Sequence, residues 1–146
     1  MPRKDIYHDA VRVALENEGW KITDDPLTVP TPGLDFHIDL GAVREIIGAE
    51  KDGIQIAIEI KSLKGNSVFY DFHQALGQFM IYRLALKMTE QNHVLYLGVP
   101  ESQYLRLERV EIYRLAWLEF EIGLLIFNEK DKTIVKWINN KNIEKQ

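Results

Sequence analysis

The sequence predicts an α/β fold in which a mixed β-sheet is flanked by helices. Three observations support this prediction. Isoleucine alternates strictly with other residues over 54–61, which is typical of a strand. Apolar residues recur at helical spacing over 68–89, and residues 94–99 form a nearly continuous apolar run, typical of a central strand covered on both faces. The order helix, strands, helix, strand, helix, hairpin therefore indicates an α/β sandwich.

The N-terminal elements follow from apolar spacing and from turn residues. A helix is expected over residues 5–18, because its apolar residues share one side and Gly19 provides a stop signal. Residues 20–23 suit a short strand. The next segment contains Pro26, Pro30, Pro32 and Gly33, which together predict an irregular loop.

A second alternating segment covers residues 36–40. Phe36, Ile38 and Leu40 would form its apolar face, and Asp39 would lie on the opposite face.

Residues 41–49 are ambiguous between a short helical turn and a strand. The Asp52-Gly53 pair is a strong hairpin signal. If residues 46–50 pair with residues 54–58, Glu50 becomes an alternative to Asp39 as the second carboxylate near Glu59; Asp39 ranks first.

The C-terminal half is predicted to contain two helices and three strands. The first helix covers residues 68–89, and Pro100 ends the strand over 94–99. A second long helix is expected over 108–119, followed by a hairpin of strands 122–127 and 133–138. The core stripe expected for the first helix is Phe72, Leu76, Phe79, Met80 and Leu84.

Composition limits the class of protein. A chain of 146 residues with 46% hydrophobic content suits one domain over 1–146, with a polar tail at 139–146. The absence of cysteine excludes disulfides and thiolate metal sites. No stretch resembles a signal peptide or a membrane span, so a cytoplasmic protein without a membrane partner is expected. The net charge of −4 argues against strong autonomous binding to nucleic acid.

The candidate site lies at the end of the isoleucine-rich strand. Glu59 and Lys61 are two residues apart, so both point to the face opposite the isoleucines. Side chains at this spacing lie roughly 6 to 7 Å apart, within reach of one phosphate, water or metal ion. If residues 36–40 form the neighbouring strand, Asp39 meets Glu59. A solvated ion pair is the structural alternative.

Two carboxylates beside an ammonium are what metal-dependent phosphodiester hydrolysis requires. Asp39 and Glu59 would hold Mg²⁺ or Mn²⁺, because hard cations prefer oxygen ligands. The ion would neutralise phosphate charge and lower the pKa of a bound water. Lys61 would orient that water or stabilise the charge developing on the phosphate. The sequence contains no glycine-rich phosphate loop and no nucleophile elbow.

Two further features accompany this site. Gln78 and Tyr82 are one helical turn apart, so the pair points the same way and is a candidate to flank the metal site. The alternative for this pair is the polar edge of an amphipathic helix. His8, on the polar side of the first helix, is a candidate base or phosphate contact, although a surface histidine is its commoner role.

Asp39, Glu59-x-Lys61 on a strand and Gln78-x-x-x-Tyr82 on the next helix resemble the PD-(D/E)xK nuclease superfamily. Residues 4–11, 38–42, 58–62 and 135–139 are similar to the XisH family, and this resemblance covers almost the full chain.

The resemblance implies a restriction-endonuclease-like fold, with Asp39 and Glu59 as metal ligands and Lys61 as the catalytic lysine. Gln78 and Tyr82 would be the supporting pair. His8 falls at the helix position where branched-DNA resolvases carry a glutamate. An insertion over residues 41–49 would account for the long interval between Asp39 and Glu59.

The XisH resemblance also implies a biological role. XisH proteins are cyanobacterial factors required, together with a small partner called XisI and a site-specific recombinase, for excision of a DNA element during heterocyst development. The favoured hypothesis is a magnesium-dependent endonuclease subunit that acts on DNA with these partners. The rival is a non-catalytic scaffold or directionality factor that binds XisI, DNA or the recombinase. A purely structural homo-oligomerisation module is the third hypothesis.

Overall fold

The computed structural model describes residues 2–45, 53–65 and 67–139. Its main element is a six-stranded sheet in the order β1-β4-β5-β6-β7-β8. The central strands β5, β6 and β7 are parallel to one another, and the three outer pairings are antiparallel. The predicted mixed sheet is therefore confirmed. The strands are β1 (Lys21–Asp24), β4 (Leu40–Arg44), β5 (Ile54–Ile60), β6 (Val94–Pro100), β7 (Leu124–Asn128) and β8 (Thr133–Ile138).

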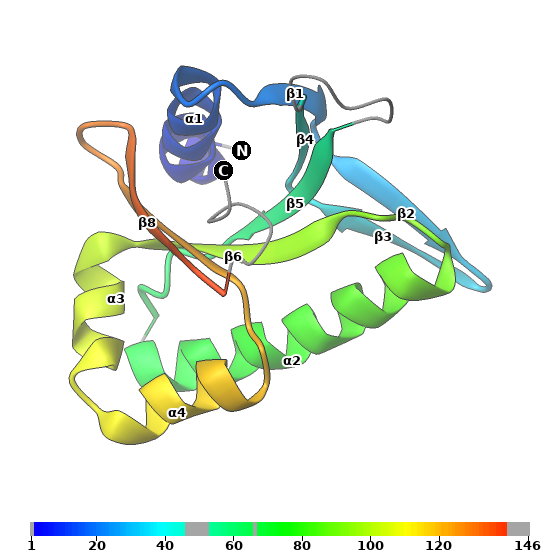
Figure 1. Ribbon diagram of the computed structural model, residues 1–146. Helices are drawn as coiled ribbons and strands as arrows, with labels where there is room; N and C mark the ends of the chain where they lie inside the picture. The colour runs from blue at the N-terminus through cyan, green and yellow to red at the C-terminus, as the bar shows by residue number, and fades with distance from the viewer. Residues whose placement is uncertain (1, 46–52, 66, 140–146) are drawn as a thin grey trace.

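Helices cover both faces of this sheet (Figure 1). Helix α1 (Pro2–Asn17) packs on one face, where it contacts β1, β5, β7 and β8. Helices α2 (Val68–Met88), α3 (Glu101–Glu108) and α4 (Glu111–Glu119) form the layer on the other face. Two hydrophobic cores result, one on each side of the sheet. None of the described helices is both long and apolar enough to cross a membrane.

The isoleucine face of β5 is buried as expected. Ile56 and Ile58 belong to the core beneath α1, whereas Ala57 lies in the core beneath α2. The strand is thus covered on both faces, and so is β6, whose apolar side chains alternate between the two cores. A buried central strand is what the continuous apolar run predicted.

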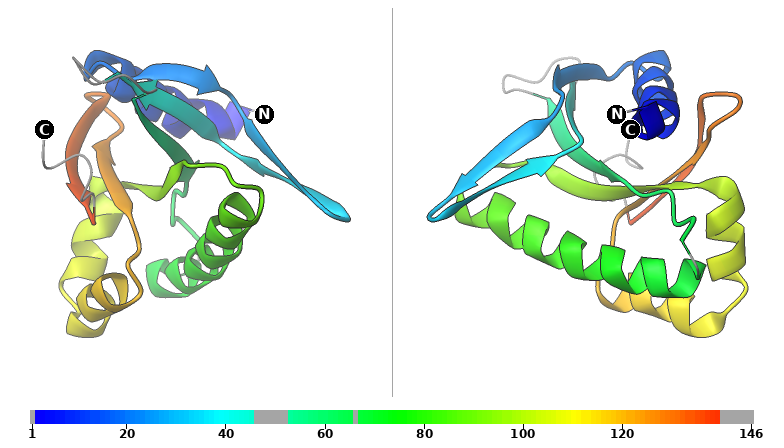
Figure 2. Two further views of the ribbon diagram at one scale, coloured as in Figure 1. Left: turned by 45° about the vertical axis from the view of Figure 1, so that its right-hand side comes forward. Right: turned by 180° about the vertical axis from the view of Figure 1, so that it is seen from behind.

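The proline-rich segment is a β-hairpin, so the predicted irregular loop is wrong. Strands β2 (Leu27–Thr31) and β3 (Leu34–Ile38) pair antiparallel and extend from the sheet toward the C-terminal half of α2 (Figure 2). Pro30 occupies an exposed position, where its missing N–H costs little. The turn places Gly33 at φ 85°, a conformation that favours glycine. Leu27 and Val29 pack inward, and this burial outweighs the prolines.

The segment 36–40 is not one strand with one apolar face. Strand β3 ends at Ile38 and β4 begins at Leu40, with Asp39 between them. Ile38 lies in the core beneath α2, but Leu40 lies in the core beneath α1. The chain therefore passes from one face of the sheet to the other at Asp39.

The ambiguous segment after Asp39 begins as a strand. Residues 40–44, rather than 46–50, pair with residues 54–58 in an antiparallel register. The predicted pairing is therefore wrong in register. Glu50 and the Asp52 position of the expected turn lie outside the described residues.

Two predictions about the helices also need correction. In α2, Phe72 and Phe79 are buried and Leu76 is half-buried, but Met80 and Leu84 are exposed. The core-facing side instead includes the small residues Ala75 and Ala85, which let the helix lie close to the sheet. The helix expected over 108–119 is shorter than predicted, because α4 begins at Glu111. Residues 101–108 form the separate helix α3. The hairpin of β7 and β8 is confirmed, whereas 140–146 of the predicted tail lie outside the described residues.

Candidate functional site

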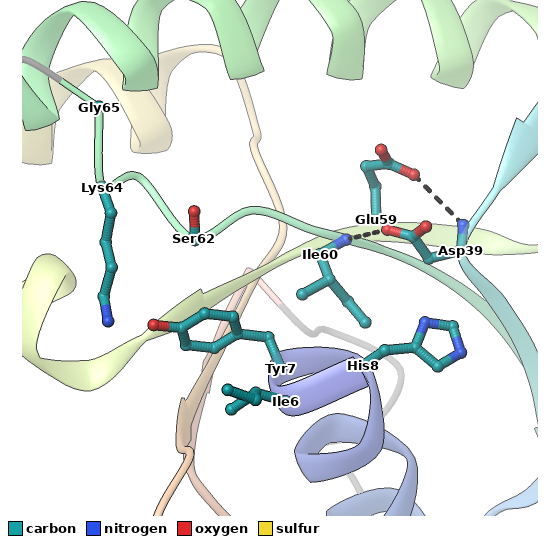
Figure 3. Close-up of a pocket in the computed structure, with 9 residues that line it drawn as sticks. All are labelled: Ile6, Tyr7, His8, Asp39, Glu59, Ile60, Ser62, Lys64 and Gly65. Carbon is teal, nitrogen blue, oxygen red and sulfur yellow. Dashed lines mark hydrogen bonds between the residues drawn. The ribbon is translucent and has the colours of Figure 1, made fainter. Parts of the chain in front are cut away.

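Asp39 and Glu59 face each other at the junction of β4 and β5. The register pairs Leu40 with Ile58. It therefore places Asp39, which precedes β4, opposite Glu59, which follows Ile58 in β5. The backbone N–H of Asp39 donates to Oε1 of Glu59 at 3.2 Å, and the backbone N–H of Ile60 donates to Oδ2 of Asp39 at 2.8 Å (Figure 3). These two bonds hold each carboxylate against the backbone of the other strand.

This pairing explains the long interval between the two acidic residues. The chain between Asp39 and Glu59 runs out along β4 and returns along β5, so the two residues meet again at the start of the hairpin. In the segment 41–49, where an insertion was expected, residues up to 44 belong to a strand of the central sheet, and residues 46–49 lie outside the described residues.

Lys61 lies just beyond β5 and contacts Glu59. Its Nζ is 3.5 Å from Oε2 of Glu59, and its side chain remains about 30% exposed. The backbone N–H of Lys61 donates to the carbonyl of Gly98 at 2.8 Å, which continues the pairing with β6 beyond the strand end. This bond positions the ammonium without fixing its terminal atoms. Asp39, Glu59 and Lys61 thus come together as the sequence predicted.

The pKa of Glu59 is raised from about 4.5 to about 7. Burial is the main cause, because it removes water from the charged form, and the negative charge of Asp39 adds to it. The ammonium of Lys61 and the backbone N–H of Asp39 act in the opposite direction. The site is therefore short of positive charge, as expected for two carboxylates that share one cation.

Gln78 and Tyr82 lie on the sheet-facing edge of α2 near the carboxylates. The side-chain amide of Gln78 donates to the Tyr82 hydroxyl at 2.7 Å. Burial raises the pKa of Tyr82, and the negative charges of Glu59 and then Asp39 raise it further, which places the phenol within their electrostatic reach. Gln74, one turn before Gln78 on α2, is exposed, and its side-chain amide donates to the Tyr70 hydroxyl.

A cavity of about 660 Å³ opens beside the two carboxylates. Figure 3 shows that it lies between the N-terminal turns of α1 and the segment that follows β5. At one end, the Lys64 amine lies 5.0 Å from the centre of the Tyr7 ring. The cavity is lined by Ile6, Tyr7, His8, Asp39, Glu59, Ile60, Ser62, Lys64 and Gly65.

A second cavity, of about 480 Å³, lies on the α2 side of the same segment. Lys61 and Gln78 line this cavity, and Ser62, Lys64 and Gly65 line both. The segment after β5 therefore separates two hollows, with the carboxylates in the first and the ammonium in the second.

His8 is part of the first cavity, and a residue that the sequence did not single out holds it there. Nε2 of His8 is 2.7 Å from Oδ1 of Asp25, and the Arg12 guanidinium contacts the other oxygen of Asp25 at 2.5 Å. Nδ1 of His8 is buried and without a hydrogen-bond partner. Asp25 was missed because it is distant in sequence from both partners and lies in a segment with no periodic pattern.

Replacing Asp25 tests how firmly the first helix is held at the site. Asp25→Ala leaves His8 and Arg12 without their shared carboxylate, and hydrogen bonds to charged groups contribute about 1.5–3 kcal/mol. We expect the free energy of unfolding in urea to fall by about 1–3 kcal/mol. Asp9→Ala, which removes only the exposed pair with Lys132, is the matched control and should change it by less than about 1 kcal/mol. Equal effects in the two variants would contradict a specific role for Asp25.

The donor set suits a hard divalent cation that keeps part of its hydration. Among the described residues, no three histidine, aspartate or glutamate side chains are grouped so that they could hold a metal ion. Asp39 and Glu59 supply two carboxylates, which is the number that Mg²⁺ commonly takes from a protein, the remaining positions going to water and substrate phosphate. Glu50, the alternative ligand, is outside the described residues.

Comparison with known proteins identifies the family. The family model described as XisH protein matches residues 1–135. The chain belongs to the XisH family. The crystal structure of an XisH family protein from Nostoc punctiforme PCC 73102 is 36% identical and has a TM-score of 0.81, with 92% of this chain and 99% of that chain covered.

A second crystal structure is similar to the same extent. It is that of a fdxN element excision controlling factor protein from Anabaena variabilis, 36% identical, with a TM-score of 0.80 over 92% of this chain and 98% of that chain. No curated protein matches this chain. The resemblance to the XisH family is therefore confirmed, and with it the mixed sheet flanked by helices.

Proposed function

We propose that this XisH protein is a metal-dependent DNA endonuclease subunit that acts in excision of a DNA element. The observation that supports this most is the meeting of Asp39 and Glu59 across the β4–β5 register, with the Lys61 ammonium 3.5 Å from Glu59. The excision role is supported by the relative from Anabaena variabilis, a fdxN element excision controlling factor. DNA, an XisI-type protein and a site-specific recombinase are the proposed partners.

Asp39 and Glu59 would hold Mg²⁺ or Mn²⁺. When bound, such an ion neutralises phosphate charge and makes a bound water more acidic. The raised pKa of Glu59 supports the assignment, because a buried carboxylate next to another carboxylate gains a partner when a cation is present. The hydrogen bonds from the backbone of Asp39 and Ile60 hold the carboxylates in place before any ligand arrives.

The remaining side chains have distinct proposed roles. Lys61, half-exposed beside Glu59, would stabilise the negative charge that develops on the phosphate oxygens. Tyr82, held by Gln78 and within electrostatic reach of the carboxylates, would limit their contact with water. Lys64, at the edge of both cavities, is available to contact the DNA backbone.

DNA cleavage by the purified protein tests this function. Linear and branched DNA would be incubated with Mg²⁺, Mn²⁺ or EDTA, with and without an XisI-type protein. We expect cleavage with either cation and none with EDTA. Asp39→Asn should reduce it by at least about 100-fold, because the amide oxygen can still accept the hydrogen bond from Ile60 but carries no charge for the cation. Cleavage that persists in EDTA would contradict the assignment.

A non-catalytic scaffold is the second candidate function. The net charge of −4 favours it, since a protein that grips DNA alone normally carries a basic surface. On this hypothesis the fold binds XisI, DNA or the recombinase and sets the direction of recombination. Complementation of excision in vivo separates the two functions. A Glu59→Gln variant that still supports excision would favour the scaffold, and one that fails would favour the nuclease.

A further inference from the structure

Helix α2 is apolar on both of its sides, although only one side meets the sheet. Its sheet-facing side buries residues such as Phe72 and Phe79. On the opposite side, four large apolar side chains are between 45 and 60% exposed, and their spacing of one, three and four residues places them on one helical stripe. A helix that is apolar all round is normally covered on all sides. This outer stripe consists of Met80, Ile81, Leu84 and Met88.

Helix α4 presents a second apolar surface, and this one is hollow. Ile112, Leu115, Leu118 and Phe120 are between 51 and 62% exposed. Together with Ala116 and Glu119 they line a cavity of about 520 Å³. Only Trp117 of this helix is buried toward the core.

Helices α2 and α4 lie in the same layer, with α4 alongside the N-terminal half of α2 (Figures 1 and 2). Arg83 of α2 donates from Nη1 to the carbonyl of Glu121 at 2.7 Å and from Nη2 to the carbonyl of Phe120 at 3.1 Å. The same guanidinium also contacts the sulfur of Met80. Nearer the start of α4, the Phe69 and Tyr113 rings stack at 5.1 Å. These contacts fix the stripe and the hollow relative to each other.

We propose that this face binds a second copy of the chain, with the α2 stripe of each copy entering the α4 hollow of the other. A two-fold axis requires one surface that carries both complementary parts, and this face carries a ridge and a hollow. The eight exposed side chains offer on the order of 800 Å² per copy, which is what one partner contributes to a stable interface.

The distribution of charge supports a copy as the occupant. Two molecules with a net charge of −4 repel each other, so self-association requires attraction between the parts that meet. The exposed residues of α2 include no carboxylate and one lysine, Lys87, whereas Glu119 lines the α4 hollow. The α2 stripe of one copy and the α4 hollow of the other therefore carry opposite charges. Asp71, the acidic residue of this helix, is half-buried and accepts a hydrogen bond from the backbone N–H of Gly65. The inference does not depend on the proposed nuclease activity.

Sedimentation equilibrium of the full chain tests the interface at several protein concentrations. We expect the wild type to approach twice the 17.0 kDa of the chain. Leu84→Glu should raise the dissociation constant at least about 100-fold, because it buries a carboxylate in an apolar contact. Ile112→Glu, on the other helix, should have the same effect. Ile6→Glu is the matched control, since Ile6 is 63% exposed and Leu84 is 60% exposed, but Ile6 lies on α1, on the other face of the sheet.

These measurements decide whether the face formed by α2 and α4 makes a dimer, and they require no DNA. Circular dichroism first establishes that each variant keeps the fold, as expected for exposed positions. A dimer lost in the α2 and α4 variants and kept in Ile6→Glu supports the interface. A wild type that stays monomeric at all concentrations up to about 100 μM, or helix variants that remain dimeric, would overturn it.

Discussion

Lys61→Ala is expected to abolish DNA cleavage while the protein stays folded. Removal of one preorganised charge-stabilising group typically reduces the rate constant by about 100- to 1000-fold. The fold should tolerate the change, because the Lys61 side chain is partly exposed and its structural contact is the backbone bond to Gly98, which alanine retains. Single-turnover cleavage at saturating protein measures the rate constant, and a thermal melt measures the fold.

Lys130→Ala is the control for a general loss of positive charge. Lys130 is exposed in the turn between β7 and β8 and lines neither of the two cavities at the candidate site. We expect the cleavage rate of Lys130→Ala to match that of the wild type within about threefold, because an exposed surface charge contributes little. If Lys61→Ala cleaves as fast as this control, Lys61 has no role in the reaction.

Glu59→Gln is expected to stabilise the metal-free protein at pH 8. The wild-type folded state keeps a proton on Glu59 up to about pH 7, whereas the unfolded chain releases it near pH 4.5. Between these values the folded state binds more protons, so the free energy of unfolding falls as pH rises. This difference in the pKa of Glu59 corresponds to about 3 kcal/mol of folding stability, which is fully lost above the folded-state pKa. Glutamine carries no charge to bury and should lack this loss.

Urea denaturation at several pH values in EDTA measures this difference. The stability of the variant minus that of the wild type should grow as pH rises from about 4.5 to about 7 and then level off. Glu16→Gln, which removes an exposed carboxylate of α1, is measured in parallel as the control for the loss of one negative charge. Parallel pH curves for wild type and Glu59→Gln would show that the pKa of Glu59 is not raised.

Adding Mg²⁺ or Mn²⁺ at pH 8 extends the experiment to the cation. A ligand that binds only the folded state stabilises it by an amount that grows with ligand concentration. The wild type should therefore gain stability, because the cation offsets the charge of Glu59 and Asp39. Glu59→Gln should gain much less. A metal-dependent gain of equal size in both proteins would place the cation elsewhere.

Local patterns in the sequence were sufficient for most of the secondary structure. The period of two over 54–61 predicted β5 and placed Glu59 and Lys61 on the same face. The apolar run at 94–99 predicted a strand buried on both sides. These predictions succeed because periodicity depends only on neighbouring residues. The prolines predicted a loop where the β2–β3 hairpin forms. That prediction failed because burial of Leu27 and Val29 outweighs the prolines.

The sequence by itself determined the residue types of the candidate site and the strand that carries Glu59 and Lys61. Only the tertiary structure decided that Asp39 meets Glu59, because the register of β4 on β5 and the change of face at Asp39 depend on which core each side chain enters. The same is true of Asp25, which reaches His8 only once α1 packs on the sheet. Contacts between residues far apart in the chain depend on packing of whole elements, which no local pattern encodes.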